Sequence, residues 1–127
     1  MKKELEEKLV KDFPNLFAGV TKSPKEGLMC FGCECGDGWY ELIRGVCEKI
    51  KDYKDVEFFQ IKEKFGELRM YTGAVTDKVH DIIEEACEQS VTVCEACGKP
   101  GKIRGGGWVR TLCDECIKGT SYEKKGD

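Results

Sequence analysis

Three stretches of the chain carry apolar residues at helical spacing, and each predicts an amphipathic helix. They are residues 3–13, 38–52 and 77–91. The middle stretch is the clearest, because its charged residues fall on the face opposite the apolar stripe. Asp37 stands where it can cap this helix. The inner stripes comprise Leu5, Leu9 and Phe13 in the first stretch, Trp39, Leu42, Ile43, Val46, Cys47 and Ile50 in the second, and Val79, Ile82, Ile83, Ala86 and Ser90 in the third.

Between the second and third helices the apolar residues change to strand-like alternation. The segment VEFFQIKEKFGELRMYT, residues 56–72, predicts two strands joined near Gly66, which can adopt the positive φ that such a turn needs. Alternation divides the side chains of a strand between two faces. The core face would carry Phe59, Ile61, Leu68 and Met70, and the other face Phe58, Lys62, Arg69 and Tyr71.

Length, charge and cysteine content narrow the class of protein. A chain of 127 residues predicts one compact domain with a small appendage. No apolar run approaches the ~20 residues that span a bilayer, and the charged start MKKELEEKLVKDF lacks the apolar region of a signal peptide. We therefore expect a cytoplasmic protein with no membrane partner. Because a reducing cytoplasm keeps thiols free, nine cysteines indicate metal binding rather than disulfides.

Two CxxC pairs carry the most specific signal in the sequence. Cys94 with Cys97 and Cys113 with Cys116 are separated by fifteen residues. This is the spacing of a zinc ribbon, in which two turns bring four sulfurs to one ion. Four thiolates leave no coordination position for water, so the predicted Zn²⁺ is structural rather than catalytic. A bound iron and four unliganded cysteines are the alternatives.

These patterns together predict an α+β protein in three parts. Residues 1–92 would form a small helix–β-hairpin–helix domain, residues 93–117 a C-terminal four-cysteine zinc ribbon, and residues 118–127 a flexible tail. Within the ribbon, the predicted strands Lys102-Ile103-Arg104 and Trp108-Val109-Arg110-Thr111-Leu112 flank a turn of Gly105, Gly106 and Gly107.

A second metal site could form around Cys30, Cys33 and Cys35, which lie together in a glycine-containing loop. The fourth ligand would be Cys47, Cys87 or His80, the only histidine. In the alternative interpretation these cysteines pack as small apolar side chains.

The charge distribution argues against a nucleic acid partner. Residues 93–118 hold five basic and three acidic side chains, and a zinc ion with four thiolates adds −2, so the ribbon is neutral. A small anionic ligand needs less charge, and Lys102, Arg104 and Arg110 beside Trp108 could hold one. The alternative is a solvated hairpin with Trp108 packed on the zinc-binding turns. No histidine lies in sequence near the segment from Cys30 to Tyr40, where a reactive thiol beside Glu34 and Asp37 would be sought, so we expect no enzyme activity.

The segments CFGCECGDGWYELI, IKEKFGELRMY and CEACGKPGKIRGGGWVRTLCDEC occur in this order over residues 28–116. This order resembles a family of small bacteriophage proteins with ECGDGWY, KEKFGxLRFY and CExCGxPG…GGWxRTLC motifs. Several members have histidine where this chain has Cys116, and an aromatic residue where it has Cys33; Met70 replaces a usual phenylalanine. The resemblance implies expression in an infected bacterium and brings no activity with it.

Without a catalytic constellation, we expect a phage protein that acts by binding. The leading hypothesis is a counter-defence protein, a homo-oligomer in the host cytoplasm, that sequesters a small nucleotide-derived immune signal. The alternative hypothesis is a zinc-ribbon protein that binds a host protein or nucleic acid to modify transcription or replication. The candidate ligand contacts are Trp39, Tyr40, Lys64, Arg69, Tyr71, Arg104, Trp108 and Arg110.

Overall fold

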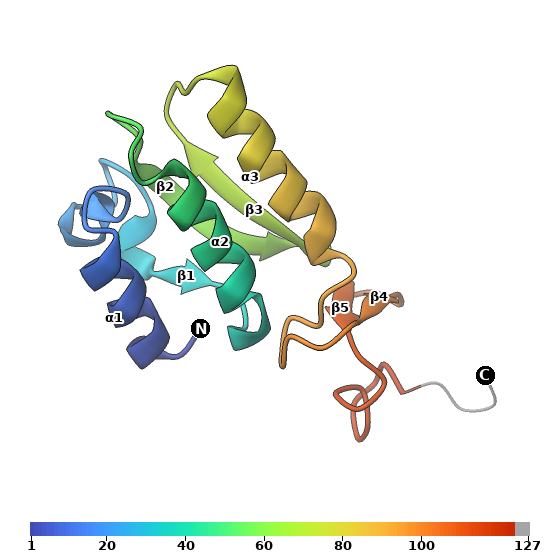
Figure 1. Ribbon diagram of the computed structural model, residues 1–127. Coiled ribbons are helices and arrows are strands. Elements are labelled where there is room, and N and C mark those ends of the chain that lie inside the picture. Colours follow the sequence, from blue (N-terminus) through green and yellow to red (C-terminus); the bar gives the residue numbers. More distant parts are fainter. Residues whose placement is uncertain (124–127) are drawn as a thin grey trace.

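The computed structural model describes residues 1–123 and contains a mixed α/β fold. Figure 1 shows helices α1, α2 and α3 beside a three-stranded sheet, with a second, smaller sheet below α3. The helices are α1 (Lys3–Asp12), α2 (Tyr40–Ile50) and α3 (Asp77–Ser90), and single 3-10 turns cover Ala18–Thr21, Met29–Phe31 and Asp37–Trp39. The strands are β1 (Cys33–Glu34), β2 (Phe58–Lys64), β3 (Glu67–Thr72), β4 (Lys102–Arg104) and β5 (Arg110–Leu112).

The larger sheet has the order β1-β2-β3, with β1 parallel and β3 antiparallel to β2. Helices α2 and α3 pack against each other and cover one face of this sheet (Figure 1). The predicted inner stripes of the helices are buried, except that Leu5, Leu42 and Ile82 are half-buried. The fully buried side chains at the centre are Trp39, Ile43, Ile50, Phe58, Ile61, Leu68 and Val79.

The predicted faces of β2 are wrong at its first two residues. Phe58 is fully buried, whereas the Phe59 side chain is 41% exposed. Phe58 pairs with Thr72 and Gln60 with Tyr71, so Phe59 is an extra, unpaired residue. Such a bulge reverses the alternation of side chains at that point. From Ile61 onward the predicted faces are correct.

A two-residue turn joins β2 to β3. Phe65 has φ of 54° and Gly66 has φ of 80°, so both central residues lie in the left-handed region, as a tight hairpin turn requires. Strand β3 forms one edge of the larger sheet, and there Ser90 of α3 accepts a hydrogen bond of 2.9 Å from Leu68 N–H. The side chain of a helix therefore occupies part of the free edge of β3, which protects it from pairing with another strand.

The predicted cap of the second helix is wrong. Asp37 lies one 3-10 turn ahead of α2, and its Oδ1 accepts a hydrogen bond of 2.7 Å from Lys2 N–H instead. At α3 the cap is Thr76, whose Oγ1 accepts from Val79 N–H at 3.3 Å. Among residues 1–123, no helix has the length and apolar character to cross a membrane.

The predicted tail lies only partly within the described residues, because 124–127 fall outside them. Residues 118–123 form turns that stay close to the second sheet. Tyr122 OH donates a hydrogen bond of 2.7 Å to the carbonyl oxygen of Trp108. The start of the predicted tail is therefore attached to the β4–β5 hairpin.

Candidate metal centre

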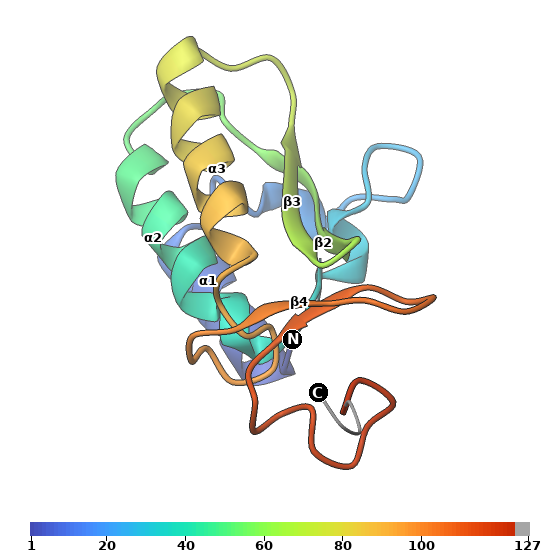
Figure 2. The same ribbon diagram turned by 90° about the vertical axis from the view of Figure 1, so that its right-hand side faces the viewer.

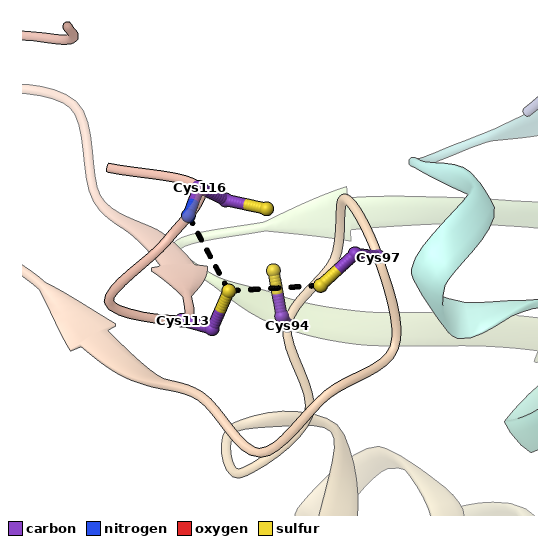
Figure 3. Close-up of side chains that lie close together, drawn as sticks. All are labelled: Cys94, Cys97, Cys113 and Cys116. Atoms are coloured by element: carbon purple, nitrogen blue, oxygen red, sulfur yellow. Dashed lines mark hydrogen bonds between the residues drawn. The ribbon is translucent and has the colours of Figure 1, made fainter. Parts of the chain in front are cut away.

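The four predicted zinc ligands meet at one point. The Sγ atoms of Cys94, Cys97, Cys113 and Cys116 all lie within 4.8 Å of one another (Figure 3). Two of them, Cys97 Sγ and Cys113 Sγ, are 3.6 Å apart. A tetrahedral ion with Zn–S bonds of ~2.3 Å would have sulfur–sulfur distances of about 3.8 Å. The cluster therefore has the size of a four-thiolate metal site and could hold an ion.

The local fold explains why the sulfurs converge. One CxxC turn precedes β4 and the other follows β5, and the antiparallel pairing of Lys102 with Leu112 brings the two turns together. Gly98 follows the first turn with φ of 85°, a conformation that favours glycine. Cys94 and Cys113 are buried, Cys116 is half-buried and Cys97 is exposed. The site is therefore buried on one side and accessible to solvent on the other.

A backbone donor favours the thiolate form of one ligand, Cys113, whereas its sulfur raises the pKa of the neighbouring Cys116 to about 12. Cys116 N–H donates to Cys113 Sγ at 3.4 Å, and this hydrogen bond lowers the pKa of Cys113 to about 6. Metal coordination requires thiolates rather than thiols. The turn geometry thus prepares Cys113 for coordination at neutral pH.

The first CxxC turn is held against the start of α2 by close backbone contacts. Gly38 N–H donates to the carbonyl oxygen of Glu95 at 2.7 Å. A Cβ atom at Gly38 would overlap the carbonyl oxygen of Cys94, so only glycine fits there. Trp39 Nε1 donates to the carbonyl oxygen of Val93 at 2.8 Å. The GDGW segment, residues 36–39, therefore packs directly against the first CxxC turn.

Glu95, between the two cysteines of the first turn, is a buried carboxylate with only 5% of its surface exposed. Its Oε2 accepts from Gly36 N–H at 2.8 Å, and its Oε1 lies 3.5 Å from Arg110 Nε. Buried carboxylates are costly unless they are paired and hydrogen-bonded. Glu95 thus ties the first turn both to the segment before α2 and to β5.

The second sheet is also attached to the turn between β2 and β3. Thr111 Oγ1 donates a buried hydrogen bond of 2.6 Å to the carbonyl oxygen of Gly66. A Cβ atom at Gly66 would lie 3.3 Å from both Thr111 Oγ1 and Val109 Cγ1, which shows how closely the segments approach. In Figure 2 the β4–β5 hairpin passes directly below this turn. All three sequence motifs therefore meet at the metal centre.

These attachments were not predicted from the sequence. Glu95 and Gly36 are 59 positions apart, and Thr111 and Gly66 are 45 positions apart. The available signal was the pair of glycines in CGDGW, since closely spaced glycines before a helix can mark a close approach of backbones.

The structure does not bring the predicted second metal site together. Within residues 1–123, the groups whose donor atoms lie within 4.8 Å of one another are the four ribbon cysteines and the fully exposed group His80, Asp81 and Glu84. Cys33 and Cys35 are buried in the main core, whereas Cys30 is half-buried and lies on a different turn. Burial raises the pKa of Cys33 to about 12, so this thiol stays neutral. Cys33 and Cys35 pack as small apolar residues.

Several of the predicted ligand contacts are occupied within the protein. Trp39 is fully buried. The hydroxyl of Tyr40 accepts from Arg44 Nη1 at 3.2 Å. Arg104 donates to the carbonyl oxygen of Leu112 at 3.1 Å and pairs with Asp114 at 2.8 Å. Arg110, as described above, lies beside Glu95. These side chains make contacts within the fold, and Arg104 and Arg110 each have an acidic partner.

The remaining candidates lie on more than one part of the surface. Trp108 is 74% exposed, so it is not packed on the CxxC turns. Lys64 Nζ lies 5.8 Å from the centre of the Phe65 ring. Arg69 pairs with Glu67 at 3.0 Å, and both Arg69 and Tyr71 line a groove between β3 and α3. The eight candidates therefore share no single pocket.

No protein-family model, no curated protein and no solved structure matches this chain. Any functional proposal therefore depends on its fold and its four-cysteine cluster.

Proposed function

We propose that this chain is a zinc-stabilised module that binds a partner protein through two adjoining hairpin turns. The ion would be one structural Zn²⁺ held by Cys94, Cys97, Cys113 and Cys116 in a zinc ribbon, since four thiolates at this spacing suit zinc. The observation that carries the functional part is the exposure of large apolar side chains on the turns around that centre.

These side chains form what we call the tip surface, comprising Phe65, Ile103, Trp108 and Val109. Phe65 is 70% exposed, Ile103 52% and Trp108 74%, and Val109 is half-buried with its Cγ1 3.3 Å from where a Cβ atom at Gly66 would lie. Ile103 pairs with Thr111, which contacts the Phe65–Gly66 turn, so the two hairpins contribute to one region. Exposed aromatic and aliphatic side chains that gather in this way mark interaction sites.

The tip surface is held in place before any partner binds. The Thr111–Gly66 hydrogen bond joins the two turns. The metal centre, through Glu95, attaches the β4–β5 hairpin to residues 36–39 before α2. A rigid surface loses little conformational entropy on association, so more of its contact energy appears as affinity. This gives the proposed zinc ion a role in binding without any contact between ion and partner.

The geometry supports a protein partner better than a small nucleotide or a nucleic acid. A small molecule needs a concave site, whereas Phe65 and Trp108 project from turns into solvent. Arg104 and Arg110, the guanidinium groups of the ribbon, are already paired with Asp114 and Glu95. The sequestration of a nucleotide signal by a homo-oligomer stays a prediction, and so does the phage origin, which would place the partner in an infected bacterium.

The test compares the chain with the double variant Phe65→Ser/Trp108→Ser as bait in lysate of a bacterial host. The matched control is Phe31→Ser, which removes another exposed ring, 59% exposed, far from the ribbon in sequence. We expect one host protein to bind the parent chain and the control but not the double variant, and to bind again when both proteins are purified. Equal binding by the double variant would rule out the tip surface.

Calorimetry with cyclic dinucleotides and a gel-shift assay with DNA address the other hypotheses directly. One-to-one nucleotide binding that survives the double substitution would favour sequestration of a small signal. A DNA shift that weakens steeply with salt would favour a nucleic acid partner.

A further inference from the structure

A second surface, away from the tip surface, has the form of a binding groove. It lies between β3 and α3 and encloses about 700 Å³, within the usual size range of ligand sites. Its floor is apolar and includes Met70, Val75, Ile83 and Cys87. Tyr71, which is 41% exposed, stands on the β3 side and offers an aromatic surface to an occupant.

The groove is long rather than round. On one side it follows α3 from Asp77 to Glu88, and on the other β3 from Glu67 to Gly73. At 1.5 Å per helical residue, the α3 wall is about 16 Å long. An extended chain advances about 3.3 Å per residue, so about five residues of an extended peptide would fit along it.

The rim of the groove is strongly acidic. It carries Glu67, Asp77, Glu84 and Glu88 against Arg69, which leaves three negative charges in excess when His80 is neutral. Glu67 is paired with Arg69, but within residues 1–123 no lysine or arginine pairs with Asp77, Glu84 or Glu88. The chain as a whole has a net charge of only −3, so this groove concentrates negative potential along one wall of α3.

The free edge of β3 is only partly available for the addition of another strand. Ser90 already accepts from Leu68 N–H, as described above. An occupant would therefore be recognised by its side chains. The shape, the apolar floor and the acidic rim together favour a linear chain in which cationic side chains alternate with apolar ones. Lysine and arginine can place their aliphatic stems on the apolar floor while their charged groups stay at the rim.

We propose that the β3–α3 groove binds an extended basic segment of a protein. This proposal is independent of the function suggested for the tip surface, since it uses different residues and needs no metal.

The experiment measures the fluorescence anisotropy of a short labelled peptide that alternates lysine with leucine. We expect saturable binding to the intact chain that weakens as salt is added. The variant Glu84→Gln/Glu88→Gln should bind about tenfold more weakly, because two negative charges of the rim are lost. The matched control is Glu85→Gln, on the same helix but facing the cleft between α2 and α3. It should bind like the parent chain, and all variants should unfold at the same temperature.

Three results would overturn the proposal. The first is the absence of binding, or equal binding of a peptide with glutamate in place of lysine. The second is unchanged affinity in the Glu84→Gln/Glu88→Gln variant. The third is displacement of the peptide by free spermine at equal charge concentration, which would show that any linear polycation suffices and that the groove does not select a peptide.

Discussion

At the scale of single residues, the glycines before α2 decide whether the first CxxC turn can pack against residues 36–39. Gly38 has no room for a side chain, because a Cβ atom would meet the backbone of Cys94 and Glu95. Backbone atoms of a docked turn cannot rotate away as a flexible side chain can. The glycines of the ECGDGWY segment are therefore explained by contact with the first CxxC turn, and its tryptophan is fully buried.

The substitution Gly38→Ala should destabilise the protein by about 2 kcal/mol or more, since the added methyl group forces two packed backbones apart. The matched control is Gly45→Ala on α2, where nothing lies within 4 Å of the added atom. This control should stabilise the helix by about 1 kcal/mol. Urea unfolding of both variants measures the difference. Equal stability of Gly38→Ala and the parent chain would contradict the close packing of Gly38 against Cys94 and Glu95.

At the scale of elements, the hydrogen bond between Thr111 and Gly66 joins the two hairpins that carry the tip surface. Thr111 is fully buried, so the carbonyl oxygen of Gly66 has no water to replace a lost donor. An unsatisfied buried acceptor costs about 1–3 kcal/mol. The contact between the hairpins should therefore depend on this one hydroxyl group.

Thr111→Val keeps the shape of the side chain and removes the donor, and we expect a loss of about 1–2 kcal/mol in the free energy of unfolding. Hydrogen exchange should also become faster in the turn at Phe65 and Gly66, because that turn is released from β5. Thr72→Val is the control, since the Thr72 hydroxyl is exposed and contacts only the neighbouring carbonyl. If Thr111→Val leaves both stability and exchange unchanged, the two hairpins are not coupled through this bond.

Elements with a local signature could be predicted from the sequence, and contacts between distant segments could not. The helices follow from apolar periodicity, and the four-cysteine cluster from the short reach of a CxxC turn. Phe58 and Phe59 were assigned to the wrong faces because a bulge adds one residue without any change in composition. The burial of Glu95 could not be predicted, because it depends on the approach of Gly36 and Arg110, which are distant in sequence.

At the scale of the whole molecule, two apolar clusters of very different size indicate what a bound metal would contribute to stability. The main core draws on all three helices and the larger sheet, from Leu9 to Ala86. The apolar cluster of the ribbon has only Cys94, Leu112 and Cys113 as buried residues, with Cys116, Ile117 and Tyr122 packed against them. So small a cluster cannot offset the conformational entropy of ordering a hairpin, whereas a bound ion can. The ribbon should therefore need its metal, and the main domain should not.

Removal of the metal should consequently unfold one part of the chain and leave the other folded. Elemental analysis should find one zinc per chain, with none in Cys97→Ser/Cys113→Ser and a full complement in the control Cys30→Ser, whose residue lies outside the cluster. After chelation, hydrogen exchange should become fast over residues 93–117 while α2 and α3 stay protected, and the tip surface should lose its partner. Exchange protection that survives chelation over residues 93–117 would show that backbone contacts alone order the ribbon. A loss of zinc in Cys30→Ser would instead reveal a second site that involves the N-terminal cysteines.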